Sequence, residues 1–157
     1  YVDRLPITVL RPFNYTGVGQ SERFLIPKIV GSFAAELPRI ELGNLNVSRD
    51  FNDVRNVAEA YAQFATIDGE GETYNVCSGA ASSLLDILDM MREISGRSLE
   101  VVVNPAFVRA NEIERLVGSR VKLDNALGRT QDFDLAATLR WMYESLCVKS
   151  GAASIQL

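Results

Sequence analysis

The sequence predicts an α/β fold, in which short strands alternate with helices. Compact apolar runs alternate along the chain with longer segments whose apolar residues recur at helical spacing. The run PITVLRPFN at 6–14 is β-branched and apolar without alternation, as expected of a strand buried on both faces of a parallel sheet. With 157 residues, of which 47% are hydrophobic and 23% charged, the chain has the composition of a globular protein that can bury a core.

Caps and turns separate the expected elements. Asn56 with Glu59 three residues later predicts a helix start with a reciprocal cap, and Ser83 with Asp86 predicts another. Gly96 predicts the end of the second of these helices. In chain order we expect a strand at 6–14, a helix at 24–37, strands at 39–43 and 49–54, a helix at 57–67, a short strand within 69–79, a helix at 84–95, a strand at 99–105, an irregular or briefly helical segment at 109–119, a short helix at 121–127 and a long helix at 135–149.

The net charge narrows the choice of partners. A value of −4 argues against a nucleic-acid scaffold, because binding to a phosphate backbone needs a concentrated surplus of Lys and Arg. A net charge of −4 still allows the protein to bind a small anion through two or three arginines that lie close together. No apolar run approaches the ~18 residues of a membrane helix, and the start YVDRLPITVL lacks the features of a signal peptide. We therefore expect a cytoplasmic protein with no nucleic-acid or membrane partner.

Missing residue types exclude several chemistries. The chain has no histidine, which excludes Ser-His-Asp and Cys-His nucleophile systems and any histidine-bearing zinc site within it. Cys77 and Cys147 are too few for a metal site. In a cytoplasmic protein we expect them to be buried free thiols rather than a disulfide.

Two patterns imitate known sites but are incomplete. Gly17-Val18-Gly19 lies between a strand and a helix, with Glu36 about twenty residues on, like a dinucleotide fingerprint. Glu22 stands at the third glycine position, where its carboxylate would repel a pyrophosphate, so we interpret the segment as a flexible loop. None of the five tyrosines has a lysine four residues on, so the chain holds no complete tyrosine–lysine base.

A third pattern places cationic and amide side chains at the ends of expected elements. Ends of elements are where open α/β folds bind ligands, and a guanidinium can hold phosphate oxygens bidentately. From spacing alone, solvated surface residues remain the alternative interpretation. The residues are Asn14 at a strand end, Lys28 in a first helical turn, Arg49 at a strand start, and Arg109 with Glu112 in the irregular segment.

Four segments, in order along residues 6 to about 145, match the motifs of one protein family. LRPFNYTGVGQ is similar to a family segment RPFN-x-x-G-x-G-Q, and LGNLNVSRDFNDVRNVAEAY to GN-x-x-x-x-RDF-x-DVRD. GETYNVCSG is similar to the strand GE-x-YNV-x-SG, and ANEIERLVGSRVKL adds a fourth segment. The chain thus resembles the carboxy-terminal half of an extended short-chain dehydrogenase/reductase, a group of NAD(P)-dependent sugar-nucleotide epimerases, dehydratases and reductases.

The resemblance implies a particular α/β architecture. Residues 1–20 would be the residual strand and loop of a Rossmann-type sheet, 21–149 the smaller α/β substrate-binding domain, and 150–157 a frayed tail. The segments are most similar to members that reduce the 4-keto group of a GDP-linked 6-deoxyhexose, and next to GDP-mannose 4,6-dehydratases. Other epimerases or dehydratases remain alternatives, as does a non-catalytic nucleotide-sugar-binding module.

The resemblance also implies roles for single residues. Asn14 and Arg49 would bind the diphosphate of a GDP-sugar, and Pro12 with Phe13 would border the nicotinamide of NADP or NAD. The remaining implied contacts are Phe24 and Lys28 to the base, and Arg109 with Glu112 to the diphosphate and ribose.

The sequence differs from the family's motifs at two positions, and it does not contain the family's amino half. Asn56 stands where the family has aspartate, and Ala110 replaces the proline of its RP-x-E pattern, which implies a less rigid loop around Arg109. The family's cofactor turn and its catalytic serine or threonine, tyrosine and lysine belong to the amino half, so we expect no catalytic residue here and interpret the chain as a fragment. As a fragment it should bind weakly, turn nothing over and self-associate through open apolar surface, whereas the full-length protein should be a homodimer.

Overall fold

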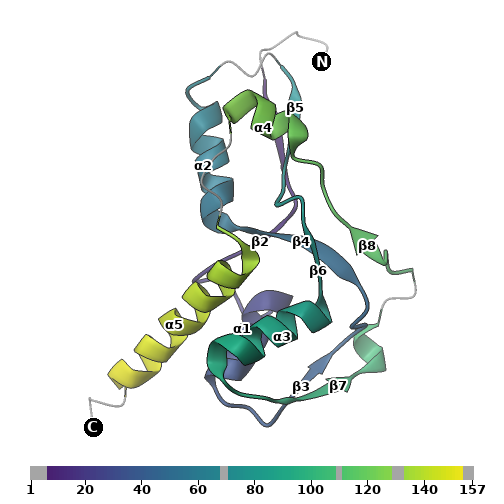
Figure 1. Cartoon of the computed structure of the whole chain (residues 1–157), viewed down its shortest axis with the longest axis vertical. Helices are drawn as coiled ribbons and strands as arrows, with labels where there is room; N and C mark the ends of the chain where they lie inside the picture. Colours follow the sequence, from purple (N-terminus) through teal and green to yellow (C-terminus); the bar gives the residue numbers. More distant parts are fainter. Residues whose placement is uncertain (1–6, 68–70, 109–110, 129–132, 154–157) are drawn as a thin grey trace.

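Parallel strand pairs with helices packed around them make up the fold (Figure 1). A computed structural model of the chain describes residues 7–67, 71–108, 111–128 and 133–153. The strands are β1 (Val9–Pro12), β2 (Asn14–Thr16), β3 (Arg39–Leu42), β4 (Ser48–Asp53), β5 (Thr73–Val76), β6 (Ala81–Ser83), β7 (Glu100–Val103) and β8 (Arg115–Leu116). The helices are α1 (Leu25–Ala34), α2 (Val54–Phe64), α3 (Leu84–Ser95), the 3-10 turn η1 (Pro105–Phe107), α4 (Val121–Leu127) and α5 (Leu135–Ala153).

The first strand segment changes its partner at Phe13. Up to that point β1 pairs in parallel with β5, and the Phe13 N–H donates to the carbonyl of Val76 at 2.9 Å. From Asn14 onward β2 pairs in parallel with β4, with Asn14 opposite Phe51. Ligands in open α/β folds bind in crevices where strands part at their carboxyl ends, so the change of partner puts Asn14 at such a position.

Strand β4 is the centre of the second sheet. It pairs in parallel with β2 and β8 and antiparallel with β6, where Arg49 lies opposite Ser82. A third sheet, β3 paired in parallel with β7, lies at the opposite end of the molecule from β1 and β5 (Figure 1). The middle position of β4 brings its residues within reach of loops from both ends.

Two apolar cores lie at the two ends of the molecule. The larger core packs α1, α3 and α5 over β3, as Figure 1 shows, and its fully buried members include Ile29, Phe33, Ile87 and Leu139. The smaller core packs α2 and α4 against β5. Its members are Val57, Ala60, Tyr74, Val76 and Leu123.

The predicted boundaries of α3 are confirmed in detail. Ser83 accepts from the Asp86 N–H at 3.1 Å, and the Asp86 carboxylate accepts from the Ser83 N–H at 2.7 Å. Gly96 ends the helix with a φ of 68°, in the left-handed region that favours glycine. The expected alternation of strands and helices is confirmed as well.

The predicted start of α2 is wrong. The cap is Asp53 rather than Asn56, because the Asp53 carboxylate accepts from the Arg55 N–H at 2.7 Å and the helix begins at Val54. The Asn56 side chain donates instead to Asn52 Oδ1 at 3.0 Å and to the Phe133 carbonyl at 2.9 Å. Asn56 therefore ties α2 to the segment that precedes α5.

Other differences concern strands and the end of the chain. The expected strand at 6–14 is two strands, and the irregular segment at 109–119 contains the short strand β8. Ile7 is 56% exposed, so the apolar run is open to solvent on one side, as expected if sheet neighbours lie outside this chain. Helix α5 continues to Ala153, past the residue at which a frayed tail was expected, and residues 154–157 lie outside the described part.

The division into a Rossmann remnant at 1–20 and a substrate domain at 21–149 stays a prediction. Segments from much later in the chain, β5 and α4, pack beside β1 at the same end of the molecule (Figure 1). The path of the chain therefore passes between the two ends more than once.

Candidate functional site

One cavity of about 880 Å³ opens between β2, β4, the start of α1, β3 and η1. Its volume is in the range of small-molecule and cofactor sites. Many of the residues expected at a site line it together, although they come from separate parts of the sequence. These are Phe13, Asn14, Phe24, Lys28, Arg49 and Glu112.

Arg49 lies in the wall of this cavity and is held there by two acceptors. Its Nη1 donates to the Ser48 carbonyl at 2.9 Å, and its Nη2 pairs with Glu112 Oε1 at 3.4 Å. Each of the two side chains in this ion pair is only 19% exposed. A guanidinium has five N–H donors, so Arg49 keeps donors available for a ligand.

Glu112 contributes an acceptor that has no donor within the described residues. Its Oε2 is buried and makes no hydrogen bond there, while its Oε1 is paired with Arg49. A buried carboxylate oxygen without a donor is unfavourable by roughly 1–3 kcal/mol. A ligand hydroxyl entering the cavity would satisfy it.

Asn14 lies one strand away from Arg49, on β2. Its Nδ2 donates to the backbone carbonyl of Asp50 at 3.1 Å, which fixes the amide against β4. Both Asn14 and Arg49 line the cavity, so the structure brings together the two residues on which the sequence-based site depends.

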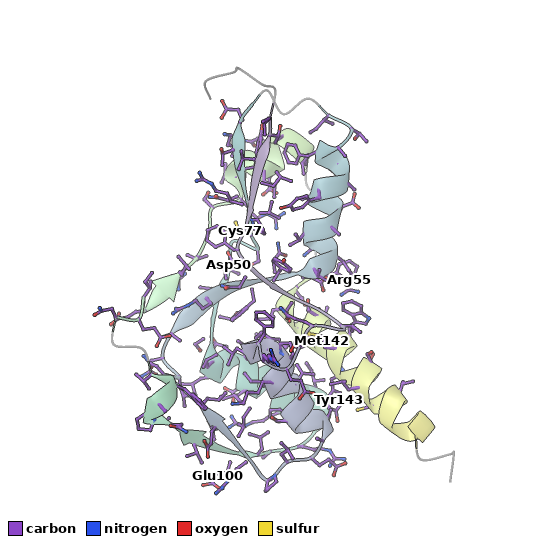
Figure 2. The ribbon with its side chains drawn as sticks, turned by 180° about the vertical axis from the view of Figure 1, so that it is seen from behind. Asp50, Arg55, Cys77, Glu100, Met142 and Tyr143 are labelled. Atoms are coloured by element: carbon purple, nitrogen blue, oxygen red, sulfur yellow. The ribbon has the colours of Figure 1, made fainter. Side chains whose placement is uncertain are left out.

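The Asp50 carboxylate explains why β4 holds this position. Asp50 is fully buried, on β4 in the middle of the molecule (Figure 2), and accepts from the Ser78 N–H at 2.8 Å and hydroxyl at 2.7 Å. It also accepts from the N–H groups of Gly79 at 3.1 Å and Gly118 at 3.2 Å. One carboxylate thus joins β4, the loop after β5 and the segment before α4, and places the neighbouring Arg49.

The other end of the cavity is built around Lys28. Its Nζ donates to the Glu41 carbonyl at 2.7 Å and lies 4.9 Å from the centre of the Phe107 ring. Gly43 permits this arrangement, because a Cβ there would lie 2.6 Å from the Phe107 carbonyl oxygen. Glu41 and Phe107 were missed by sequence reasoning, since nothing in their local sequence shows that η1 approaches the end of β3.

Some expected site residues are not brought to the cavity. Pro12 is exposed on β1 and does not line it, although Phe13 does. Arg109 lies outside the described residues. The assigned roles, including those of the residues that do line the cavity, remain predictions.

The segment around Gly17, which the sequence predicts to be a flexible loop, is packed closely against its surroundings at Gly17. A Cβ at Gly17 would lie 2.5 Å from Val54 Cγ1 and 3.2 Å from the Trp141 ring. The Glu22 carboxylate lies over Gly31 in α1, where an added Cβ would meet Glu22 Oε1 at 2.9 Å. Close packing therefore accounts for Gly17 in the loop and for Gly31 in α1, whereas a Cβ at Gly19 would meet no atom within 4 Å.

Among the described residues, no cluster of three or more His, Cys, Asp or Glu side chains is placed to hold a metal ion. Cys77 and Cys147 are free thiols; Cys77 is buried as expected, but Cys147 is exposed on α5, which contradicts that part of the prediction. Within the same residues, no helix is both long and apolar enough to cross a membrane.

Comparison with solved structures defines the class of fold. A proposed epimerase from Burkholderia cenocepacia J2315 is 51% identical, with a TM-score of 0.90 over 93% of this chain and 48% of that one. RMD from Pseudomonas aeruginosa, solved in complex with NADPH, is 31% identical, with a TM-score of 0.83 over 90% of this chain and 48% of that one. The fold is that of the Rossmann-type extended short-chain dehydrogenases/reductases, as the sequence predicts.

The family follows from the sequence comparisons. The chain belongs to the GDP-mannose 4,6 dehydratase family, whose model matches residues 2–142. Its curated relatives include the GDP-6-deoxy-D-talose 4-dehydrogenase of Aggregatibacter actinomycetemcomitans, 39% identical over 88% of this chain and 48% of the relative. The GDP-6-deoxy-D-mannose reductase of Pseudomonas aeruginosa is 33% identical over 85% of this chain and 46% of the relative. The chain thus spans about half the length of these relatives.

Proposed function

We propose that the chain forms the nucleotide-sugar-binding half of an NAD(P)-dependent oxidoreductase. The observation that carries this proposal is the pairing of Arg49 with Glu112, whose second carboxylate oxygen is buried without a donor, in a cavity of about 880 Å³. A cation beside an unsatisfied acceptor suits a diphosphate next to a ribose hydroxyl. Asn14 adds an amide on the adjoining strand.

The reaction that fits best is reduction of the 4-keto group of a GDP-linked 6-deoxyhexose. The two relatives described above are named for GDP-6-deoxyhexoses, one as a 4-dehydrogenase and the other as a reductase. When bound, NADPH or NADH would supply a hydride to C4, and an acid in the half that this chain does not span would supply the proton to O4. Within this chain Phe13 offers the cofactor an apolar surface at the cavity wall.

A GDP-mannose 4,6-dehydratase is the second candidate, favoured by the family model. Net cofactor use distinguishes the two in the full-length protein. A reductase consumes one NAD(P)H for each 4-keto sugar reduced, whereas a dehydratase converts GDP-mannose with no net change in the cofactor. A non-catalytic module would bind GDP and do neither. We also propose that the full-length protein is a cytoplasmic homodimer with no nucleic-acid partner.

Arg49 provides the direct test. We expect Arg49→Ala in the full-length protein to weaken GDP binding by roughly 1.5–3 kcal/mol, the scale of hydrogen bonds to a charged group. Isothermal titration calorimetry with GDP measures this. Arg92→Ala is the matched control, because Arg92 is paired with Asp89 on the surface of α3, away from the cavity. Equal GDP affinities for wild type and Arg49→Ala would remove Arg49 from the site.

A further inference from the structure

Aromatic and charged groups line the Lys28 end of the cavity. Phe24 and Phe107 are 58% and 50% exposed, and both line it. Lys28 and Glu41 line it as well, from α1 and β3. Exposed rings at a cavity wall offer flat apolar surface to a planar ligand.

The Glu41 carboxylate has capacity for further hydrogen bonds. Its Oε2 accepts from Asn104 Nδ2 at 2.8 Å, whereas its Oε1 has no hydrogen-bond donor among the residues that the structure describes. Asn104 thereby restrains the side chain and leaves one oxygen for a ligand. Lys28 is restrained in a similar way by the Glu41 carbonyl at 2.7 Å, which leaves two of its three donors.

The two ends of the cavity differ in the side chains that line them. Lys28, whose Nζ contacts the Glu41 backbone carbonyl, and Glu41 itself line one end beside the two exposed rings, which suits a planar uncharged group with both donors and acceptors. At the other end, Asn14 and Arg49, which is paired with Glu112, offer amide and guanidinium donors, which suits phosphate oxygens. A nucleoside diphosphate would therefore lie with its base towards Lys28 and Glu41.

We propose that Glu41 is a specificity-determining residue that selects guanine, by accepting hydrogen bonds from N1–H and the 2-amino group. Lys28 donates to the O6 and N7 acceptors of the same base, and Phe24 and Phe107 contact its faces. Adenine in this position turns the lone pair of its N1 towards the carboxylate, which disfavours it. This inference rests on the proposed function and adds Glu41 and Phe107 to the base contacts that the family resemblance implies.

Calorimetry with GDP, IDP and ADP on the full-length protein tests this assignment. IDP lacks only the 2-amino group, so the ratio of GDP to IDP affinity reports the contact with that group. We expect wild type to prefer GDP over IDP by about tenfold, the size of one hydrogen bond to a charged group. Glu41→Gln should lower GDP affinity by about tenfold or more, bring the GDP/IDP ratio close to one, and leave ADP affinity undiminished.

Glu100→Gln is the matched control. Glu100 is an exposed carboxylate at the start of β7, opposite Arg39 of β3 (Figure 2), and lies outside the cavity lining. It should retain the wild-type GDP/IDP ratio. Because Glu41 is exposed, Glu41→Gln should melt at the wild-type temperature.

Failure of this inference and failure of the proposed function look different. A Glu41→Gln protein that keeps the wild-type GDP/IDP ratio overturns the role of Glu41, while GDP binding that depends on Arg49 still supports the proposed function. A wild-type protein that binds none of the three nucleotides overturns both.

Discussion

Cys77 is fully enclosed where β5 ends, and its environment sets its reactivity. The Gly118 backbone packs against it so closely that an added Cβ would lie 2.6 Å from the Cys77 sulfur. Burial, together with the nearby negative charge of Asp50, raises the pKa of Cys77 from 9.0 to about 11. Cys147 is exposed on α5. The two thiols should therefore differ strongly in reactivity, because the thiolate is the reactive form.

Thiol labelling checks this difference. At pH 8 we expect a water-soluble thiol reagent to modify Cys147 in the native protein and to reach Cys77 only after unfolding, with peptide mass spectrometry locating the label. Folding raises the pKa of Cys77, because the buried site favours the neutral thiol. The contribution of this neutral thiol to the free energy of unfolding is complete below pH 9.0 and is lost as the pH rises towards about 11. Rapid native labelling of Cys77 would contradict the buried environment.

At the residue scale, motifs predicted part of the site. Asn14 and Arg49 could be identified because each belongs to a segment with a recognisable order of residue types. Glu41 could not, because its place in the cavity depends on Lys28 and on the close approach of Phe107 at Gly43. Such contacts join segments that are far apart in sequence, and no local pattern reports them.

Among the elements, β4 depends on the Asp50 carboxylate. We expect Asp50→Asn to destabilise the protein by about 2–4 kcal/mol, because the amide turns an NH₂ group towards donors that need an acceptor. GDP affinity should fall too, since Arg49 is the adjacent residue. Urea unfolding followed by circular dichroism measures the free energy of unfolding.

Asp89→Asn is the control, because Asp89 lies on the surface of α3 with its side chain 65% exposed. This substitution should change the free energy of unfolding by less than about 0.5 kcal/mol. Equal stabilities for the two variants would contradict the role of Asp50.

The caps show which boundaries local sequence can predict. Ser83 and Asp86 satisfy each other's backbone groups within four residues, so the local sequence is enough to predict the start of α3. In NDVRN two candidates compete, and the choice depends on distant partners. Asp53 accepts from Thr138 Oγ1 at 2.7 Å, and the Arg55 guanidinium lies 3.6 Å from the centre of the Phe133 ring. These contacts to α5 and the segment before it are invisible in the local sequence.

For the molecule as a whole, the alternation of strand-like and helix-like segments along the sequence predicts the fold class. This pattern does not predict that the first apolar run changes partner strand at Phe13, because the register of β2 on β4 is set by tertiary packing. Within the described residues β1 pairs with β5 alone, so its other edge is unpaired, and Ile7 just before β1 is 56% exposed. Self-association of the 157-residue chain through this surface stays a prediction, which light scattering would check.

We propose that side chains from separate segments bind one nucleoside diphosphate in the cavity between β2, β3 and β4. A crystal structure of the full-length protein with GDP would locate the nucleotide. We expect diphosphate oxygens within about 3.2 Å of the Arg49 guanidinium and the Asn14 amide, with the base beside Lys28. GDP bound elsewhere, with Arg49 still paired only with Glu112 and Ser48, would remove these residues from the nucleotide site.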